Sequence, residues 1–153
     1  FCEKILPAES DRFSKIRETL RKRFKLQIPK DGPNQNYSKA DHRAAFEGFL
    51  DFLRANLAGQ TAVRVDAAWA SQSQVLSGFA ELGSPDLVLR EDELADELPH
   101  LARRIGRMEP GEVPLAVADQ PYALEDIYDA SLEEKVAKIY KRDYVMFGFG
   151  TWQ

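Results

Sequence analysis

The residues best suited to acid–base or nucleophilic chemistry near neutral pH are two histidines and one cysteine. His42 stands between Asp41 and Arg43 at the expected start of a helix. It could act as a general base there, or it could occupy the capping region without any chemical role. His100 fits a structural or solvated position. Cys2 has no histidine near it in the sequence and does not predict a catalytic thiol. A single cysteine excludes an intramolecular disulfide framework and a zinc cluster of cysteines.

A second candidate for chemistry is the acidic run Glu91, Asp92 and Glu93, which follows a short apolar stretch. These carboxylates could orient a substrate hydroxyl or hold a cation. They would equally stabilise the first turn of a following helix through its dipole. The sequence has no Gly-x-x-x-x-Gly-Lys-Ser/Thr loop, no Gly-x-Gly-x-x-Gly and no Gly-x-Ser-x-Gly. A self-contained nucleotide cradle is therefore not expected.

Composition indicates one soluble globular domain. The 153 residues are 44% hydrophobic and 30% charged, with a formal net charge of −4. Mild acidity argues against general coating of nucleic acid, and no apolar run is long enough for a membrane span. The charge is uneven: residues 1–30 carry nine bases and four acids, whereas residues 81–112 carry nine acids and four bases. The basic part could hold a phosphate, a sulfate or an acidic glycan, or it could be a solvated helix face.

Apolar spacing predicts mostly helices. One helix carries Phe13, Ile16, Leu20 and Phe24. A second lies between Asp41 as N-cap and Gly59, and is expected to be buried on two sides because Phe52 lies off its main stripe. A third, over 71–82, is expected to face the core through its apolar positions: Val75, Leu76, Phe79 and Leu82.

Residues 87–89 predict a short, buried parallel strand that ends near 90 and has no obvious partner. A fourth helix spans 94–105, with a kink or break at Pro99. Residues 107–128 predict a long loop. The last helix starts at a capping box of Ser131 and Glu134 and ends before Gly148.

Three segments resemble motifs of a known family, and they follow one another along the chain in the same order as in that family. The C-terminal one, residues 139–149, is similar to a closing hY..DF..FGY pattern. Residues 85–94 are similar to a strand followed by an acidic residue, D.h...E.L, with Asp92 where Glu is usual. Residues 46–53, followed by 66–72, are similar to F..Fh.hh and then..HW.pq. Together they resemble the C-terminal half of the type 2 carbohydrate sulfotransferases, which include chondroitin, dermatan and HNK-1 enzymes and bacterial relatives.

The resemblance implies an α/β fold: the helix-rich C-terminal part of a P-loop-like sulfotransferase domain, with one short parallel strand near 87–90. It implies transfer of a sulfuryl group from 3′-phosphoadenosine-5′-phosphosulfate to a carbohydrate hydroxyl. The family places its donor-binding motifs in an N-terminal half that residues 1–153 lack. The chain is therefore expected to be a single partial domain that supplies mainly the acceptor side and is inactive alone.

The same resemblance suggests substrate-binding residues, whereas the catalytic residues stay unassigned. Trp69 could stack on a sugar ring or be a core anchor, and Arg64 could meet an acidic group of the acceptor or simply be exposed. Asp66 and Asp92 are the other two candidate substrate-binding residues. The family's His before this Trp is Ala68 here, and the paired cysteines of eukaryotic members are missing. Their absence favours a bacterial-type cytoplasmic protein over one of the Golgi lumen.

A competing hypothesis from a different class is a non-enzymatic helical module. Its basic first helix would bind an acidic polymer or a protein partner, with no transfer chemistry.

Overall fold

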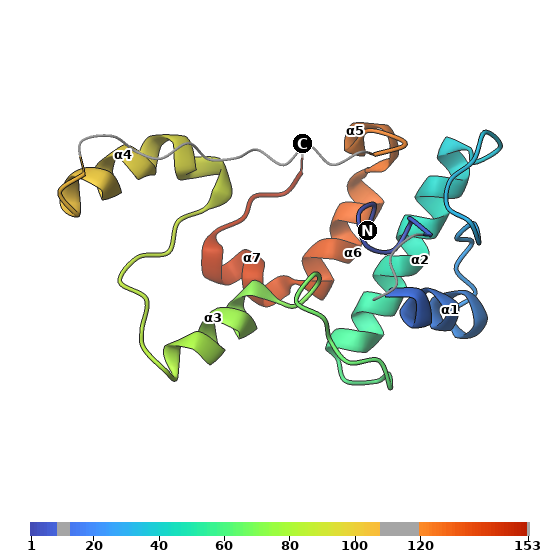
Figure 1. The fold of residues 1–153 in the computed structure, drawn as a ribbon, viewed down its shortest axis with the longest axis horizontal. Coiled ribbons are helices and arrows are strands. Elements are labelled where there is room, and N and C mark those ends of the chain that lie inside the picture. Colours follow the sequence, from blue (N-terminus) through green and yellow to red (C-terminus); the bar gives the residue numbers. More distant parts are fainter. Residues whose placement is uncertain (9–12, 108–119, 153) are drawn as a thin grey trace. The chain divides into compact units, whose positions relative to one another are not determined.

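The structure, a computed structural model, describes residues 1–8, 13–107 and 120–152, and these residues form helices joined by loops (Figure 1). They divide into two compact units. The first comprises Phe1–Val75 and Ala118–Gln153, and the second comprises Leu76–Val117. In chain order the helices are α1 (Ser14–Arg23), α2 (Lys39–Leu57), α3 (Gln72–Ala80), the 3-10 turn η2 (Glu91–Glu93), α4 (Leu94–Arg104), α5 (Leu124–Ile127), α6 (Ala130–Ile139) and α7 (Lys141–Phe147).

Helix α2 forms the centre of the first unit. Ser38, not Asp41, is its N-cap: the Ser38 side chain accepts from the Asp41 amide, and the Asp41 carboxylate accepts from the Ser38 amide. Phe52 is fully buried while Phe49 and Leu53 are also buried, which confirms that α2 is covered on two sides. Such apolar burial is the main driving force for folding at about 25 cal/mol per Å².

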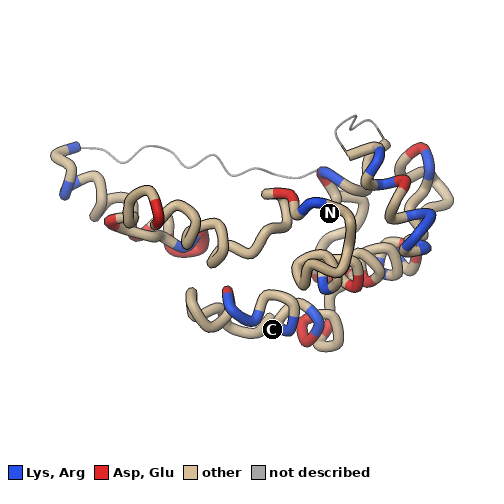
Figure 2. The backbone as a smooth tube through the Cα atoms, turned by 90° about the horizontal axis from the view of Figure 1, so that it is seen from below, with Lys and Arg blue, Asp and Glu red and all other residues tan. Residues whose placement is uncertain are grey.

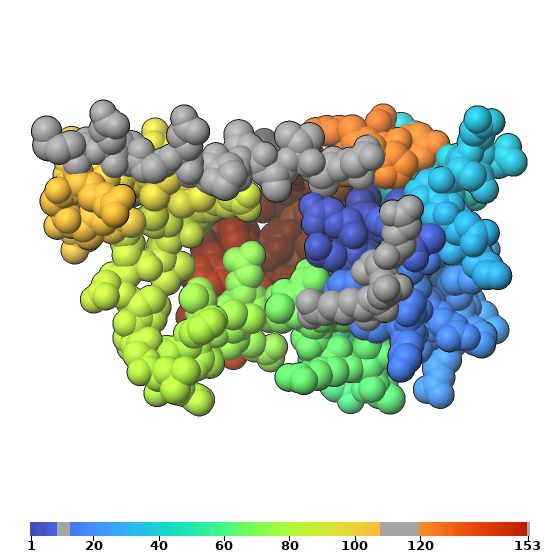
Figure 3. All heavy atoms as spheres, in the orientation of Figure 1, coloured from blue at the N-terminus to red at the C-terminus, as the bar shows by residue number. Residues whose placement is uncertain are grey.

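The N-terminal segment and α1 pack on α2. Ile5, Leu6 and Leu20 are buried in the same core, and the Arg17 side chain donates to the carbonyl oxygens of Ile5 and Leu6. In the space-filling view the first residues of the chain lie directly against α1 (Figure 3). The stretch Arg21–Arg23 is exposed, as its position beside and opposite the apolar stripe predicted.

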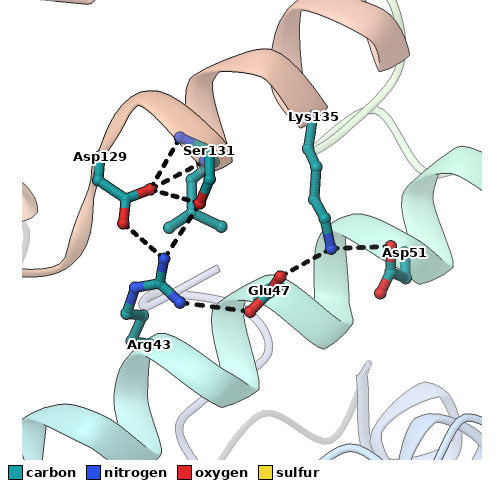
Figure 4. A network of polar contacts seen from close by, with 7 residues as sticks. Arg43, Glu47, Asp51, Asp129, Ser131 and Lys135 are labelled. Atoms are coloured by element: carbon teal, nitrogen blue, oxygen red, sulfur yellow. Dashed lines mark hydrogen bonds and ion pairs between the residues drawn. The ribbon is translucent and has the colours of Figure 1, made fainter.

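A network of charged residues joins α2 to α6 (Figure 4). Arg43 binds Asp129 at 2.6 Å and Glu47 at 3.3 Å, and Lys135 binds Glu47 at 2.8 Å and Asp51 at 3.3 Å. Asp129 is also the N-cap of α6, since its side chain accepts from the backbone amides of residues 131 and 132. The predicted cap at Ser131 was therefore wrong by two positions. The hydrogen bonds that Asp129 accepts and the positive charge of Arg43 lower the pKa of Asp129.

The second unit contains η2 and α4. Acidic residues occupy the first turn of α4 and basic residues its last turn, which complements the helix dipole (Figure 2). Helix α4 continues through Pro99 from Leu94 to Arg104, so of the two expected alternatives, a kink or a break, the break does not occur. In the part of the chain that the structure describes, no helix is long and apolar enough to cross a bilayer.

Three expectations about elements need correction. Residues 87–90 form no strand, and Leu87 and Val88 are 42% and 48% exposed, because no partner strand exists among the described residues. The predicted core side of α3 is largely exposed: Phe79 is 61% and Leu82 90% exposed. The predicted loop over 107–128 contains α5, and its residues 108–119 lie outside the described residues.

Candidate functional site

Two segments far apart in the sequence meet at a buried carboxylate in the first unit. Asp143, on α7, is 3% exposed. One of its oxygens accepts from Ser71 Oγ at 2.7 Å and from the Ser73 amide at 3.0 Å, and the other accepts from the Gln72 amide at 2.9 Å. Burial raises the pKa of Asp143, but these hydrogen bonds together outweigh it and leave the pKa lowered. Asp143 therefore supplies the start of α3 with the acceptors that its first amides need.

Trp69 lies next to this junction and is held from several sides. Its indole N–H donates to Asn56 Oδ1 at 2.9 Å, and its backbone oxygen accepts from the Tyr140 hydroxyl at 2.9 Å. Ring contacts to Phe49 and Phe52 lie at centroid distances of 6.1 Å. With only 6% of its surface exposed, Trp69 is a core anchor whose edge reaches the junction.

A pocket of about 260 Å³ opens between the two segments. Its size is just below the usual range for small-ligand pockets, which suits one small ring more than a larger ligand. Its walls combine four aromatic rings with two polar side chains, and all of these belong to the first unit: Trp69, Tyr140, Tyr144, Phe149, Gln72 and Asp143. Aromatic faces beside a few polar groups suit the mixed apolar and hydroxylated surface of a pyranose.

Tyr144 links this pocket to a second buried carboxylate. Its hydroxyl donates to Glu133 Oε1 at 2.9 Å, and Tyr128 donates to Glu133 Oε2 at 2.6 Å. Glu133 is 7% exposed. Burial and the Glu133 carboxylate raise the pKa of Tyr144 to about 12, so its phenol stays protonated at neutral pH. A phenol that donates to a carboxylate can take a proton from an incoming hydroxyl as it passes its own proton on.

Three of the four predicted binding residues belong to one short segment of the sequence. Arg64 and Asp66 lie with Trp69 between α2 and α3, where Arg64 is exposed and Asp66 accepts from the Ala68 amide at 3.0 Å. Asp92 belongs to the second unit, where it is exposed and paired with Arg90 at 2.6 Å. Trp69 alone among the four lines the pocket.

His42 is the fourth residue of α2 and is 1% exposed. Its Nδ1 lies 3.2 Å from the Tyr37 hydroxyl, and its Nε2 lies 3.8 Å from the Cys2 sulfur. Burial lowers the pKa of His42. A histidine enclosed in this way packs the core and does not face the pocket, so the general-base alternative for it receives no support here.

Sequence reasoning did not single out Glu133, and it gave Tyr144 no chemical role. Nothing in the sequence marked Glu133 as a functional residue, because a glutamate in the first turn of a helix is common. Tyr144 and Asp143 did have a signal, since both fall inside the closing motif of residues 139–149. A motif marks which positions matter, but which of them share a pocket depends on the fold.

The two segments that form the pocket also carry two of the three similarities noted in the sequence. A comparison with family models matches the sulfotransferase family over residues 1–150. Searches of curated proteins and of solved structures give no match. A match over nearly the whole chain, with two motif segments meeting at one aromatic pocket, shows that this chain belongs to the sulfotransferase family.

Proposed function

We propose that this chain is the acceptor side of a carbohydrate sulfotransferase, which moves a sulfuryl group from 3′-phosphoadenosine-5′-phosphosulfate to a sugar hydroxyl. Membership of the sulfotransferase family supports sulfuryl transfer in general. The single observation that carries the acceptor assignment is the aromatic pocket at the junction of residues 68–72 with α7 and the residues after it.

In this proposal the sugar ring lies against Tyr140, Tyr144 and Phe149, with the edge of Trp69 at one wall. Gln72 supplies a polar group that can fix the orientation of a ring hydroxyl. Both carboxylate oxygens of Asp143 already accept from α3, so its role is to hold Gln72 in place. Arg64 and Asp66 remain proposed contacts for the parts of the acceptor outside the pocket. Asp92, in the second unit, remains a separately proposed substrate-binding residue.

Tyr144 and Glu133 handle the acceptor's proton. As the hydroxyl oxygen forms its bond to sulfur, its proton passes to the Tyr144 oxygen, and the Tyr144 proton passes to Glu133, 2.9 Å away. At the same time the bond between sulfur and the donor's 5′-phosphate oxygen breaks, and 3′-phosphoadenosine 5′-phosphate leaves with that electron pair. Tyr144 gains one proton and loses one, and Glu133 ends the step protonated. Proton transfer by a positioned side chain contributes roughly 10²- to 10⁴-fold to a rate.

The donor needs groups outside these residues. The sequence lacks the lysine-containing phosphate loop that cradles such a nucleotide. We place the donor site in residues N-terminal to Phe1. In that arrangement residues 1–153 are part of one P-loop-like domain. A bacterial-type, cytoplasmic protein fits the lack of paired cysteines.

Calorimetric titration of the donor product, 3′-phosphoadenosine 5′-phosphate, tests this division of roles. The titration compares residues 1–153 with a chain extended upstream. Binding by the extended chain alone is the expected result. Tight binding by residues 1–153 alone would overturn the placement of the donor site, and no binding by either folded chain would overturn the transferase assignment.

A further inference from the structure

A second hollow, of about 790 Å³, lies beside α1 in the first unit. It is formed by one face of α1 and by the segment that follows this helix, and it shares no residue with the aromatic pocket. Its volume is typical of small-molecule sites. The side chains that decide its charge are five cations and one carboxylate: Arg17, Arg21, Lys22, Lys25, Lys30 and Glu18. We call it the cationic groove.

The charge of this groove is poorly compensated within the protein. Glu18 is engaged by Lys22, its neighbour one turn along the helix. Arg21, Lys25 and Lys30 have no ion pair with any residue that the structure describes. Exposed lysines and arginines commonly lie alone on a surface, but here they line a concave wall, where their fields add.

Arg17 makes the groove unusual. It is 6% exposed, and its guanidinium donates only to backbone carbonyl oxygens: Ile5 at 2.8 Å, Leu6 at 3.2 Å, Pro29 at 2.8 Å and Lys30 at 3.3 Å. It has no carboxylate partner among the described residues. Burial lowers the pKa of Arg17 most, the nearby charge of Arg21 lowers it further, and the Asp31 carboxylate raises it by a smaller amount. The Asp31 carboxylate offsets only a small part of the cost of burying this cation, and a bound anion would relieve more of it.

The helix dipole explains only part of this pattern. Cations in the last turn of α1 stabilise it, because they lie near the negative end of its dipole. Arg17 lies in the first half of α1, and Lys25 and Lys30 lie beyond its end, so the dipole does not account for them. Lys25 has φ of 56°, a left-handed conformation that is unfavourable for a residue with a side chain and that glycine usually adopts.

We propose that the cationic groove binds a small ligand bearing a phosphate or sulfate monoester. Such a group carries up to two negative charges on oxygens that accept several hydrogen bonds, and arginine matches it in geometry and charge. Leu26 and Ile28 also line the groove, and their small exposed parts provide an apolar contact for the organic part of the ligand. This site does not depend on the transfer reaction proposed above.

The test is a titration followed by NMR amide shifts at constant ionic strength. Inorganic sulfate and inorganic phosphate are the first probes, and glucose 6-sulfate and adenosine 5′-monophosphate follow. Saturable shifts in residues 14–30 are expected. Tighter binding of one of the two organic esters identifies the ligand source as sugar or nucleotide. Shifts that do not saturate, or that follow only ionic strength, overturn the proposal.

Matched variants separate the groove from general charge. Arg21→Ala and Lys25→Ala each remove one cation that lines it, and each is expected to raise Kd about tenfold. Arg23→Ala removes the same charge from the same helix, but Arg23 is exposed and does not line the groove. It should change Kd less than about twofold. Equal weakening by Arg21→Ala and Arg23→Ala contradicts a defined site.

Discussion

Asp143 accepts a 2.7 Å hydrogen bond from Ser71 across 72 positions of the sequence. Because this carboxylate also accepts from the Gln72 and Ser73 amides, α7 fixes where α3 begins. The two segments that enclose the aromatic pocket therefore share one polar anchor. Asp143 therefore shapes the pocket through the hydrogen bonds that both of its carboxylate oxygens accept from residues 71–73.

The first prediction removes this anchor. Asp143→Asn replaces one acceptor oxygen with an amide donor that faces the backbone donors of α3. It should lower the free energy of unfolding by about 1–3 kcal/mol, measured by urea denaturation. The control is Asp96→Asn, an exposed position on α4, which should stay within about 0.5–1 kcal/mol of wild type. Equal losses in both variants would contradict the anchoring role.

The second prediction concerns pH and the two histidines. The pKa of His42 is lowered in the folded state, so below its unfolded pKa of about 6.5 the unfolded chain binds a proton that the folded chain does not. Stability is therefore full above that pH and declines as the pH falls through it. Unfolding measured at about pH 7.5 and about pH 5.5 should show this decline.

His42→Gln should flatten the decline over this pH range. His100→Gln should leave it unchanged, because His100 is exposed. A decline that persists in His42→Gln and disappears in His100→Gln would show that His100, and not His42, governs this pH dependence.

The third prediction compares the two tryptophans. Trp69→Phe keeps a ring in the core but leaves Asn56 Oδ1 without its donor, and it should cost about 1–3 kcal/mol of unfolding free energy. Trp69→Ala should cost about 3–5 kcal/mol. Trp152 is 46% exposed, so Trp152→Phe should change stability by less than about 0.5 kcal/mol. Thermal and urea unfolding measure all three, and a neutral Trp69→Ala would refute the core assignment.

The fourth prediction tests the correction at α3. Leu20 is fully buried, and Leu20→Ala should cost about 2–5 kcal/mol. Phe79 is 61% exposed, so Phe79→Ala should change stability by less than about 0.5 kcal/mol. A loss at Phe79 as large as that at Leu20 would show that the apolar side of α3 is covered in solution.

These cases show what the sequence could and could not predict. The stripes of α1 and α2 predicted buried faces, because their apolar residues recur at helical spacing. The same pattern in α3 predicted a buried face wrongly, since periodicity identifies a face but does not supply a surface to cover it. The predicted strand at 87–89 failed for the same reason, as a strand needs a partner.

The candidate site was only partly predictable. The tryptophan of residues 66–72 and the closing motif drew attention to Trp69 and to residues 139–149, but the motifs carried no distance between them. Helices α6 and α7 separate at Tyr140, which turns Tyr144 toward Glu133 one helix earlier. That break could not be read from apolar spacing, because the residues on both sides keep helical periodicity.

The most direct test of the acceptor site is sulfuryl transfer by the upstream-extended protein to a panel of monosaccharides and disaccharides. Tyr144→Phe keeps the ring and removes the hydroxyl that reaches Glu133. It should lower kcat roughly 10²- to 10⁴-fold with little change in the KM for the sugar. Tyr122→Phe is the control, since Tyr122 donates to the Tyr37 carbonyl away from the pocket. Wild-type kcat in Tyr144→Phe, or an equal loss in Tyr122→Phe, would contradict the account.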